Sequence, residues 1–261
     1  MSKKKQALLT VLETKAIYPV FQPIVDLQNG NVVAYESLSR IENKNIDINI
    51  EELFCLAEAY GCVWKLEKLC RDKALKASMN KPSGTKIFLN VDGQIFQDSN
   101  FISGFTNRKL EKFGLLNEDI VFEITERTDI ENYVLLQAIM NHYIDQGYQI
   151  ALDDVGAGYS GLNRVVNTTP NYLKADIELV RNIHLSKSKQ SMMKLLVEYC
   201  DEMGLKLIAE GIETQEELEC ICNLHVHYGQ GYYLGIPDCK FNGISSQALQ
   251  YLMNIHGMIK T

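Results

Sequence analysis

The sequence predicts an α/β fold, a modified TIM-like (β/α)8 barrel in which an opening β-hairpin makes one strand antiparallel. Short apolar runs alternate with longer amphipathic patterns along almost all of the 261 residues, which is typical of strands and helices in parallel βα units. Eight such apolar runs within about 240 residues match the size of one closed barrel rather than an open sheet.

The opening hairpin is the irregular part of this pattern. Its strands, 18–26 and 31–38, are joined by Gln28-Asn29-Gly30, and an Asn-Gly pair readily takes the positive φ of a tight turn. Further strands are predicted at 86–91, 120–124, 149–153, 172–175, 206–209 and 227–228. Amphipathic helices are predicted at 51–60, 64–79, 131–147, 187–204, 214–224 and 245–256.

Composition narrows the class of protein. Hydrophobic residues make up 46% and charged residues 23%, as in a soluble globular protein. No linker composition divides the chain, so we expect a single domain over residues 1–261. The net charge of −7 argues against a partner made of duplex nucleic acid.

No apolar run approaches the ~18 residues of a membrane span. Residues 6–13 are too short and polar for a signal-peptide core. We therefore expect a cytoplasmic protein with no membrane segment.

The seven cysteines are odd in number and form no CxxC pair, which fits free thiols rather than a disulfide framework. Most fall in apolar helical patterns, where a free cysteine behaves as a small buried hydrophobe. A zinc site through Cys220, Cys222, His225 and His227 is the alternative, but its spacing does not match the usual zinc knuckles.

Polar side chains stand at the end of nearly every predicted strand. The carboxyl ends of barrel strands converge on one face, where active sites are built, so we expect these side chains to meet. A lone amide such as Asn90 or Gln230 at a strand end is more often a cap or a loop residue, but so many successive ends are hard to explain that way. The residues are Glu36, Asn90, Glu123, Asp153, Asp154, Lys174, Asp176, Glu210 and Gln230.

Clustered carboxylates need protons or bound cations to offset their repulsion. Hard oxygen ligands without convergent His or Cys favour Mg²⁺, Mn²⁺ or Ca²⁺ over zinc. Lys174 could form a Schiff base or act as a charge partner, and the surrounding acids favour the charge partner. The glycine-rich stretch 155–161 is not a P-loop, and we interpret it as a hinge that presents Asp153 and Asp154 to metal.

A series of short motifs, in order along the chain, resembles one known family. They are QPIVD at 22–26, YESLSR at 35–40, FLNV at 88–91, EITE at 123–126, DDVGAGYS at 153–160, KAD at 174–176, AEGIET at 209–214 and QGY at 230–232 with Pro237. Together they resemble the EAL-domain family of cyclic-di-GMP-specific phosphodiesterases, which have a modified α/β barrel. The resemblance runs from about Leu9 to Leu252, the expected core of the domain.

The resemblance implies metal-dependent hydrolysis of cyclic-di-GMP to linear pGpG, with two Mg²⁺ or Mn²⁺ ions per site and Ca²⁺ as an inhibitor. It implies Glu210 as general base and Lys174 as the group that orients water or offsets charge on the phosphorus. The implied positions for the first metal are Glu36, Asn90, Glu123 and Asp153, and those for the second are Asp154, Asp153 and Glu210.

The remaining implied roles concern substrate and support. Gln22, Arg40 and Gln230 would contact the substrate, and Glu126 would anchor the glycine loop. Glu213 and Asp176 would be structural. The family also implies a homodimer and a sensory or diguanylate-cyclase domain that is either fused to the barrel or controls it as a partner.

Four positions depart from the family pattern. Ser37 and Ala175 lie beside candidate site residues without replacing one, and Asp92 adds a negative charge. Val155 replaces an aromatic residue that could steady the glycine loop. Two alternatives therefore stay open: an EAL-like receptor that binds cyclic-di-GMP with slow or no turnover, and a metal-dependent hydrolase of another phosphodiester.

Overall fold

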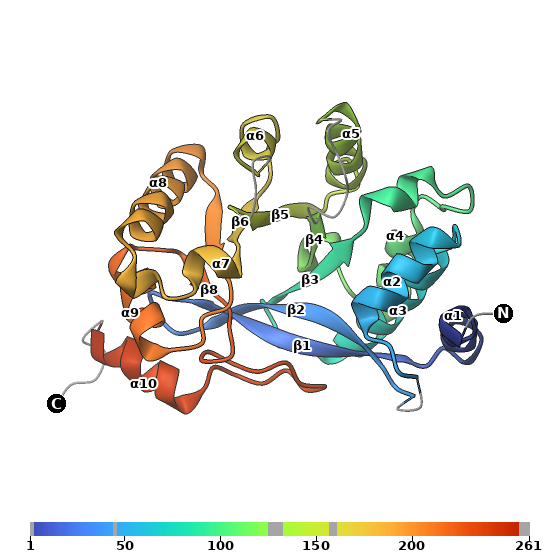
Figure 1. Cartoon of the computed structure of the whole chain (residues 1–261), viewed down its shortest axis with the longest axis horizontal. Helices are drawn as coiled ribbons and strands as arrows, with labels where there is room; N and C mark the ends of the chain where they lie inside the picture. Colours follow the sequence, from blue (N-terminus) through green and yellow to red (C-terminus); the bar gives the residue numbers. More distant parts are fainter. Residues whose placement is uncertain (1–2, 44–45, 125–132, 157–160, 256–261) are drawn as a thin grey trace.

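The protein is described by a computed structural model that covers residues 3–43, 46–124, 133–156 and 161–255. Within them, eight strands close into one barrel in chain order (Figure 1). The strands are β1 (Ile17–Asp26), β2 (Val32–Ile41), β3 (Lys86–Val91), β4 (Ile120–Ile124), β5 (Gln149–Val155), β6 (Tyr172–Ala175), β7 (Lys206–Ala209) and β8 (Tyr228–Gly229).

Strand β1 is antiparallel to both of its neighbours, β2 and β8, whereas all other neighbouring pairs are parallel. The predicted modified barrel with one antiparallel strand is confirmed. The turn between β1 and β2 contains Gly30 at a φ of 73°, the left-handed region that the Asn-Gly signal anticipates.

Helices surround the barrel (Figure 1). Those in the described residues are α1 (Lys3–Thr14), α2 (Ile50–Ala59), α3 (Val63–Ala77), α4 (Phe105–Phe113), α5 (Tyr133–Ile144), α6 (Gly161–Val166), α7 (Ile177–Val180), α8 (Lys187–Met203), α9 (Gln215–Asn223) and α10 (Ser246–Ile255). Short 3-10 turns occupy Ser78–Asn80, Gly93–Gln97, Asn117–Asp119 and Ile183–Leu185. The six predicted helices correspond to α2, α3, α5, α8, α9 and α10, while α1, α4, α6 and α7 were not predicted.

Several helices begin at a side-chain cap that the sequence encodes. Asn49 caps α2 and accepts a hydrogen bond from the Glu52 N–H, while the Glu52 carboxylate accepts one from the Asn49 N–H. Thr214 and Glu217 form the same reciprocal box at the start of α9. Such boxes satisfy backbone donors that have no partner within the helix, so they fix where each helix begins.

The barrel interior holds a distinct apolar layer, which we call the barrel floor. Its buried side chains come from β1 to β7 and are separate from the larger apolar core that packs the helices against the outside of the strands. Tyr228 of β8 packs against the same layer. The buried members of the barrel floor are Ile24, Ala34, Phe88, Val121, Ala151, Tyr172 and Ile208.

The cysteines are less buried than expected. Cys70 and Cys200 are buried, but Cys55 and Cys239 are exposed and the other three are half-buried. All seven are free thiols, as predicted. Among the described residues, no helix has both the length and the apolar character needed to cross a membrane.

Candidate active site

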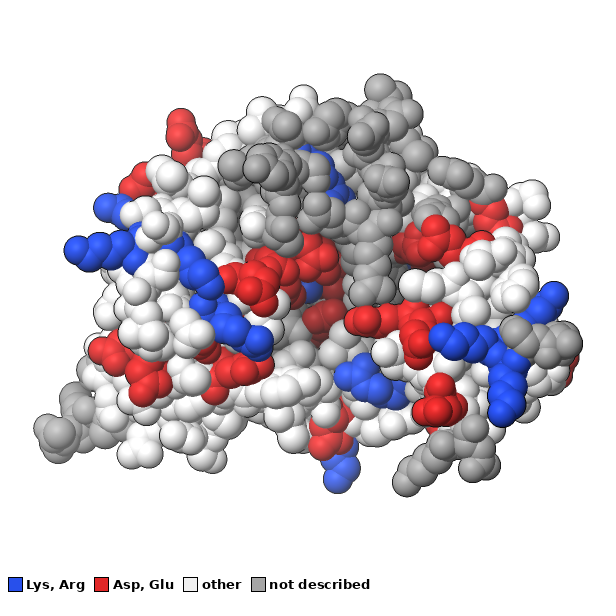
Figure 2. Space-filling view, in the orientation of Figure 1, with Lys and Arg blue, Asp and Glu red and all other residues white. Residues whose placement is uncertain are grey.

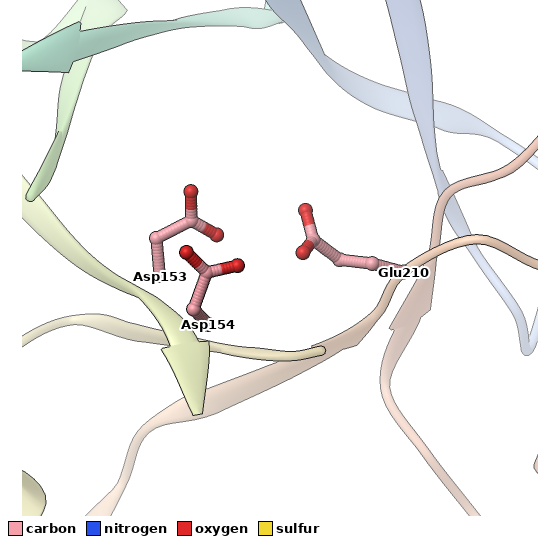
Figure 3. A group of neighbouring side chains, drawn as sticks. All are labelled: Asp153, Asp154 and Glu210. Atoms are coloured by element: carbon pink, nitrogen blue, oxygen red, sulfur yellow. The ribbon is translucent and has the colours of Figure 1, made fainter. Parts of the chain in front are cut away.

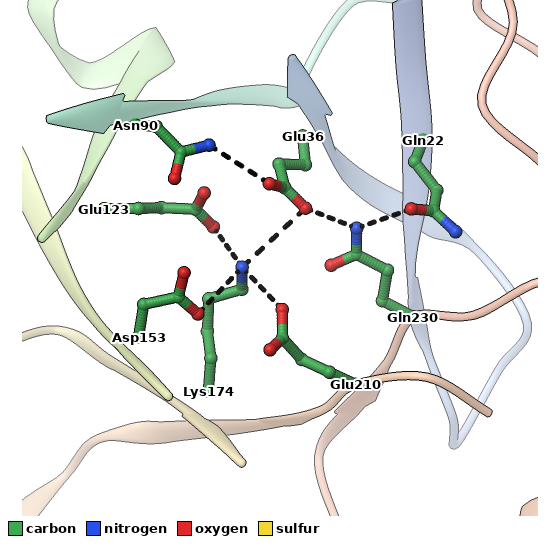
Figure 4. A network of polar contacts seen from close by, with 8 residues as sticks. All are labelled: Gln22, Glu36, Asn90, Glu123, Asp153, Lys174, Glu210 and Gln230. Atoms are coloured by element: carbon green, nitrogen blue, oxygen red, sulfur yellow. Dashed lines mark hydrogen bonds and ion pairs between the residues drawn. The ribbon is translucent and has the colours of Figure 1, made fainter. Parts of the chain in front are cut away.

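A polar layer lies next to the barrel floor, toward the carboxyl ends of the parallel strands. Side chains two residues apart on a strand point to the same side, so the residue two positions beyond each floor residue also faces inward. In antiparallel β1 the equivalent step runs backwards, from Ile24 to Gln22, which is paired in register with Glu36. The polar layer consists of Gln22, Glu36, Asn90, Glu123, Asp153, Lys174, Glu210 and Gln230 (Figure 4).

Strand β5 contributes two adjacent carboxylates to this layer because its end is irregular. In a regular strand, Asp153 and Asp154 would point to opposite faces. The register against β6 shifts between Leu152 and Val155, and Asp154 has a φ of 56°, a region that Asp tolerates better than most residues. Carboxylate oxygens of Asp153, Asp154 and Glu210 consequently all lie within 4.8 Å of one another (Figure 3).

The Lys174 ammonium lies at the centre of the polar layer (Figure 4). Its Nζ lies 2.6 Å from Glu210 Oε1 and 2.7 Å from Glu123 Oε1. It lies 3.2 Å from Asp153 Oδ1 and 3.7 Å from Glu36 Oε2. The Lys174 side chain is 1% exposed, so this single cation is in contact with four carboxylates away from bulk water.

Three amides hold Glu36 and its neighbours in place. The Gln230 Nε2 donates to Glu36 Oε2 at 2.6 Å and also lies 3.1 Å from Gln22 Oε1. Asn90 Nδ2 donates to the other Glu36 oxygen at 3.2 Å. Gln22 Nε2 in turn donates to the Gly235 carbonyl at 3.1 Å. Both Glu36 oxygens thus have an orienting donor.

Burial and neighbouring charges shift the pKa values of these groups in different directions. Burial and the Glu36 charge raise the pKa of Glu123 well above its ordinary value. Burial likewise raises the pKa of Glu210 to about 8, opposed by the Lys174 charge. Burial also disfavours the charged forms of Glu36 and Lys174. Nearby opposite charges outweigh it, so the pKa of Glu36 is lowered and that of Lys174 raised.

The donor set fits a hard divalent cation. Glu123 Oε2 is buried and has no hydrogen-bond donor among the described residues, whereas Glu123 Oε1 and Asp153 Oδ1 face the Lys174 ammonium at 2.7 and 3.2 Å. A buried carboxylate oxygen with no hydrogen-bond donor is uncommon unless an ion or a water molecule binds it. These oxygens, with no His or Cys beside them, suit Mg²⁺, Mn²⁺ or Ca²⁺. In the described residues, Asp153, Asp154 and Glu210 are the one group of acidic, His or Cys side chains whose ligand atoms lie within 4.8 Å of one another, so the alternative Cys/His zinc site does not form. The carboxylates predicted for the first ion, Glu36, Glu123 and Asp153, do not reach that spacing and converge on the Lys174 ammonium instead.

A cavity of about 350 Å³ opens beside the polar layer. Glu36, Asn90, Asp153 and Asp154 line one end, and Arg40 lines its wall with Nη1 donating to the Ser39 carbonyl at 2.9 Å. Acidic side chains gather around the hollow at the centre of this face (Figure 2). The far wall comes from α2 and α3 and includes Ile50, Phe54, Cys70, Arg71 and Ala74.

Sequence reasoning missed a buried ion pair in that far wall. Glu67 and Arg71 pair on α3 with side chains 4% and 3% exposed. Arg71 also donates to Thr106 Oγ1 at 3.1 Å, and Glu67 Oε2 accepts from the Asp92 N–H at 3.0 Å. Burial raises the pKa of Glu67 to about 7. The signal was available, because both charged residues fall on the face of α3 that is otherwise apolar.

The remaining predicted residues lie outside the polar layer. Glu213 pairs with Arg181 at 3.1 Å on the surface, where both side chains are 45% exposed. Asp176 caps α7 by accepting from the Glu178 N–H at 2.7 Å. Val155 is buried within β5 and its carbonyl accepts from the Asp176 N–H at 3.2 Å. Glu126 and residues 157–160 of the glycine loop lie outside the described residues.

Comparison with known proteins decides the family. The model of the EAL domain matches residues 5–237. The chain belongs to the EAL-domain family. The resemblance inferred from the motifs is thereby confirmed.

A curated relative named as a phosphodiesterase matches most of this chain. The probable cyclic di-GMP phosphodiesterase PdeG of Escherichia coli K12 is 25% identical over 238 residues, 89% of this chain and 47% of PdeG. The EAL domain described here thus spans about half the length of that relative.

Solved structures share the fold over most of the chain. The cyclic-di-GMP-bound standalone versatile EAL protein of Vibrio cholerae O395 has a TM-score of 0.76 and 26% identity, covering 89% of this chain and 97% of its own. The manganese and cyclic-di-GMP complex of Klebsiella pneumoniae BlrP1 has a TM-score of 0.77 and 26% identity, covering 85% of this chain and 56% of its own. A calcium complex of BlrP1 has a TM-score of 0.79 at 25% identity, covering 88% of this chain and 58% of its own.

Proposed function

We propose that this EAL domain hydrolyses cyclic-di-GMP to linear pGpG with the help of two Mg²⁺ or Mn²⁺ ions. The observation that carries the proposal is the polar layer, in which four carboxylates surround Lys174 and a fifth, Asp154, lies beside Asp153 and Glu210. The names of PdeG and of the cyclic-di-GMP-bound relatives supply the substrate.

The residues divide between two cation positions. Glu36, Asn90, Glu123 and Asp153 would hold the first ion, and Asp154 would hold the second together with Asp153 and Glu210. Bound divalent cations supply a nucleophilic water at neutral pH and neutralise negative charge on a phosphodiester. The BlrP1 complexes with manganese and calcium support a divalent ion in this fold, and we propose Ca²⁺ as an inhibitor.

The chain's own side chains would bind the substrate and move the proton. Arg40 on the cavity wall would pair with a phosphate oxygen, because guanidinium groups match phosphate geometry. Gln22 and Gln230 would position the dinucleotide at the same end. Glu210 would accept the proton of the attacking water, and Lys174 would orient that water or offset charge developing on the phosphorus.

A receptor that binds cyclic-di-GMP without turnover is the second candidate. It is favoured by Val155, which is smaller than the aromatic residue typical of the family and lies at the start of the glycine loop. Asp92, which lines the cavity, adds negative charge beyond Asn90. A metal-dependent hydrolase of a different phosphodiester would use the same ligands, but Arg40 and the relatives' names favour cyclic-di-GMP.

Control of the activity would come from outside the catalytic barrel. The chain spans about half of PdeG, and from the family resemblance we propose control by a sensory or diguanylate-cyclase domain, either fused or as a partner. A homodimer and a cytoplasmic location remain predictions of the same kind, as do the bracing role of Glu213 and Asp176 and the loop-anchoring role of Glu126.

The test is hydrolysis of cyclic-di-GMP by the purified protein, followed by chromatography, with Mg²⁺, Mn²⁺, Ca²⁺ or chelator. We expect pGpG with Mg²⁺ or Mn²⁺, and none with Ca²⁺ or chelator. Tight binding of cyclic-di-GMP with no product under any metal would mean that the protein is a receptor and not a phosphodiesterase. If the protein hydrolyses another phosphodiester but not cyclic-di-GMP, the proposed substrate is wrong.

A further inference from the structure

The Lys174 ammonium is the shared ion-pair partner of four carboxylates in the polar layer. All ion pairs that Glu36, Glu123, Asp153 and Glu210 make within the described residues are with this ammonium. The side chain of Glu123 is fully buried and that of Lys174 is 1% exposed. No other cation in the described part of the chain pairs with these four carboxylates.

We propose that Lys174 is a positioning residue, an internal cation that holds the four carboxylates together before metal binds and competes with the metal for them. The inference rests on the metal site of the proposed function and adds a role of Lys174 in the metal-free domain. The Lys174 ammonium would bring the four carboxylates together in the metal-free protein, so the ions enter a site that is already formed.

The first part of the argument is electrostatic. Four acidic groups converge in a buried layer, and the charges of those that are ionised repel one another strongly, since like charges in a poorly solvated site are screened little. One ammonium within 2.6 to 3.7 Å of all four offsets much of that repulsion. Without it, the metal-free layer would contain buried acids with no opposite charge, which is strongly destabilising.

The second part concerns competition. A divalent cation bound by Glu36, Glu123 or Asp153 would take over the charge compensation that the ammonium provides, and the two positive charges would repel each other. Removing the ammonium should therefore weaken the metal-free fold while it leaves the metal-bound fold less affected. The stabilisation caused by metal, which measures differential binding to the folded state, should become larger.

The direct test replaces Lys174 by a side chain of similar length without charge. For Lys174→Met in chelator we expect a melting temperature about 10 °C below that of the unmodified protein. Saturating Mn²⁺ should recover most of this loss, so that the Mn²⁺-induced rise is larger in the variant. The control is Lys187→Met, at an exposed position of α8, which should melt as the unmodified protein does with and without Mn²⁺.

A second variant keeps the test decisive if Lys174→Met is poorly folded in chelator. Adding Glu36→Gln removes a buried carboxylate charge that the ammonium offsets, so the double variant should melt well above Lys174→Met in chelator. Such non-additivity is the signature of direct coupling. The proposal is overturned if Glu36→Gln gives no recovery, or if Lys174→Met leaves the chelator melting temperature and the Mn²⁺-induced rise unchanged. None of these readouts requires turnover, so a failure of the proposed hydrolysis would be seen separately.

Discussion

At the scale of single residues, backbone conformation decides where the chemistry can occur. Asp154 adopts a φ of 56° at an irregular end of β5, and this turns its carboxylate toward Asp153 and Glu210 instead of away from them. Glu36 is oriented by donors on both of its oxygens. The site therefore depends on a few local departures from regular strand geometry, supported by side-chain amides.

Arg40 allows substrate binding to be tested apart from the carboxylates. For Arg40→Ala we expect cyclic-di-GMP to bind about 10- to 100-fold more weakly, because a charge-assisted hydrogen bond is lost. The measurement is isothermal titration calorimetry in Ca²⁺. Arg108→Ala, at an exposed position of α4, is the matched control, and equal affinities for the two variants would remove Arg40 from the substrate site.

At the scale of elements, the connections after the strands are packed tightly against each other. Gly211 follows Glu210 with a φ of 67°, and a Cβ at this position would lie 2.2 Å from Ile177 Cγ1 on α7. The close approach requires glycine for two reasons, the positive φ and the absence of a side chain. It links the segment that carries Glu210 to the helix that follows Lys174.

Replacing this glycine should therefore perturb both stability and catalysis. For Gly211→Ala we expect a loss of about 3 kcal/mol in the free energy of unfolding, measured by urea denaturation, since the left-handed conformation and the overlap both oppose it. Gly84→Ala is the control, because Gly84 has a φ of 79° but no atom within 4 Å of its Cβ position, and about 1–2 kcal/mol is expected. Similar losses at both positions would show that the packing against Ile177 is unimportant.

His227 provides a pH-dependent tie between α8 and β7. Its Nδ1 accepts from the Leu207 N–H at 3.2 Å, which places the proton on Nε2, 2.9 Å from Asp201 Oδ1. Burial and the nearby Lys206 charge lower the pKa of His227 below its ordinary value. The folded state thus binds this proton less readily than the unfolded state, and the stability due to the neutral imidazole is lost as the pH falls below about 6.5.

The corresponding measurement is the free energy of unfolding between pH 7.5 and 5.5. It should decrease less steeply in His227→Gln than in the unmodified protein, because the titrating group has been removed. An unchanged slope in His227→Gln would mean that this histidine does not contribute to the pH dependence.

At the scale of the whole molecule, hydrophobic periodicity was enough to predict the barrel. The eight strands and six of the helices were predicted because each buries a continuous apolar face. Helix α4 was missed because Phe105–Phe113 contains mostly polar residues, and α7 was missed because it is 4 residues long. The Glu67–Arg71 pair was missed because hydrophobic periodicity locates the buried face of α3 but does not show that two charged side chains on it pair with each other.

The polar layer could be predicted in outline but not in detail. A polar residue two positions beyond an apolar one is visible in each strand, so convergence at one mouth follows from the barrel topology. The irregular end of β5 and the four contacts of Lys174 depend on the three-dimensional backbone, which no spacing rule specifies. Residue roles within the layer are carried by family motifs and remain predictions for experiment.

The most direct test of the account is single-turnover hydrolysis of cyclic-di-GMP in Mn²⁺ by the unmodified protein and by Glu210→Gln. Glu213→Gln, on the exposed side of the same segment, is the matched control. We expect pGpG from the unmodified protein and from Glu213→Gln, and at least about a 100-fold slower rate from Glu210→Gln with substrate binding largely retained. Undiminished turnover by Glu210→Gln, or no product from the unmodified protein, would contradict the account.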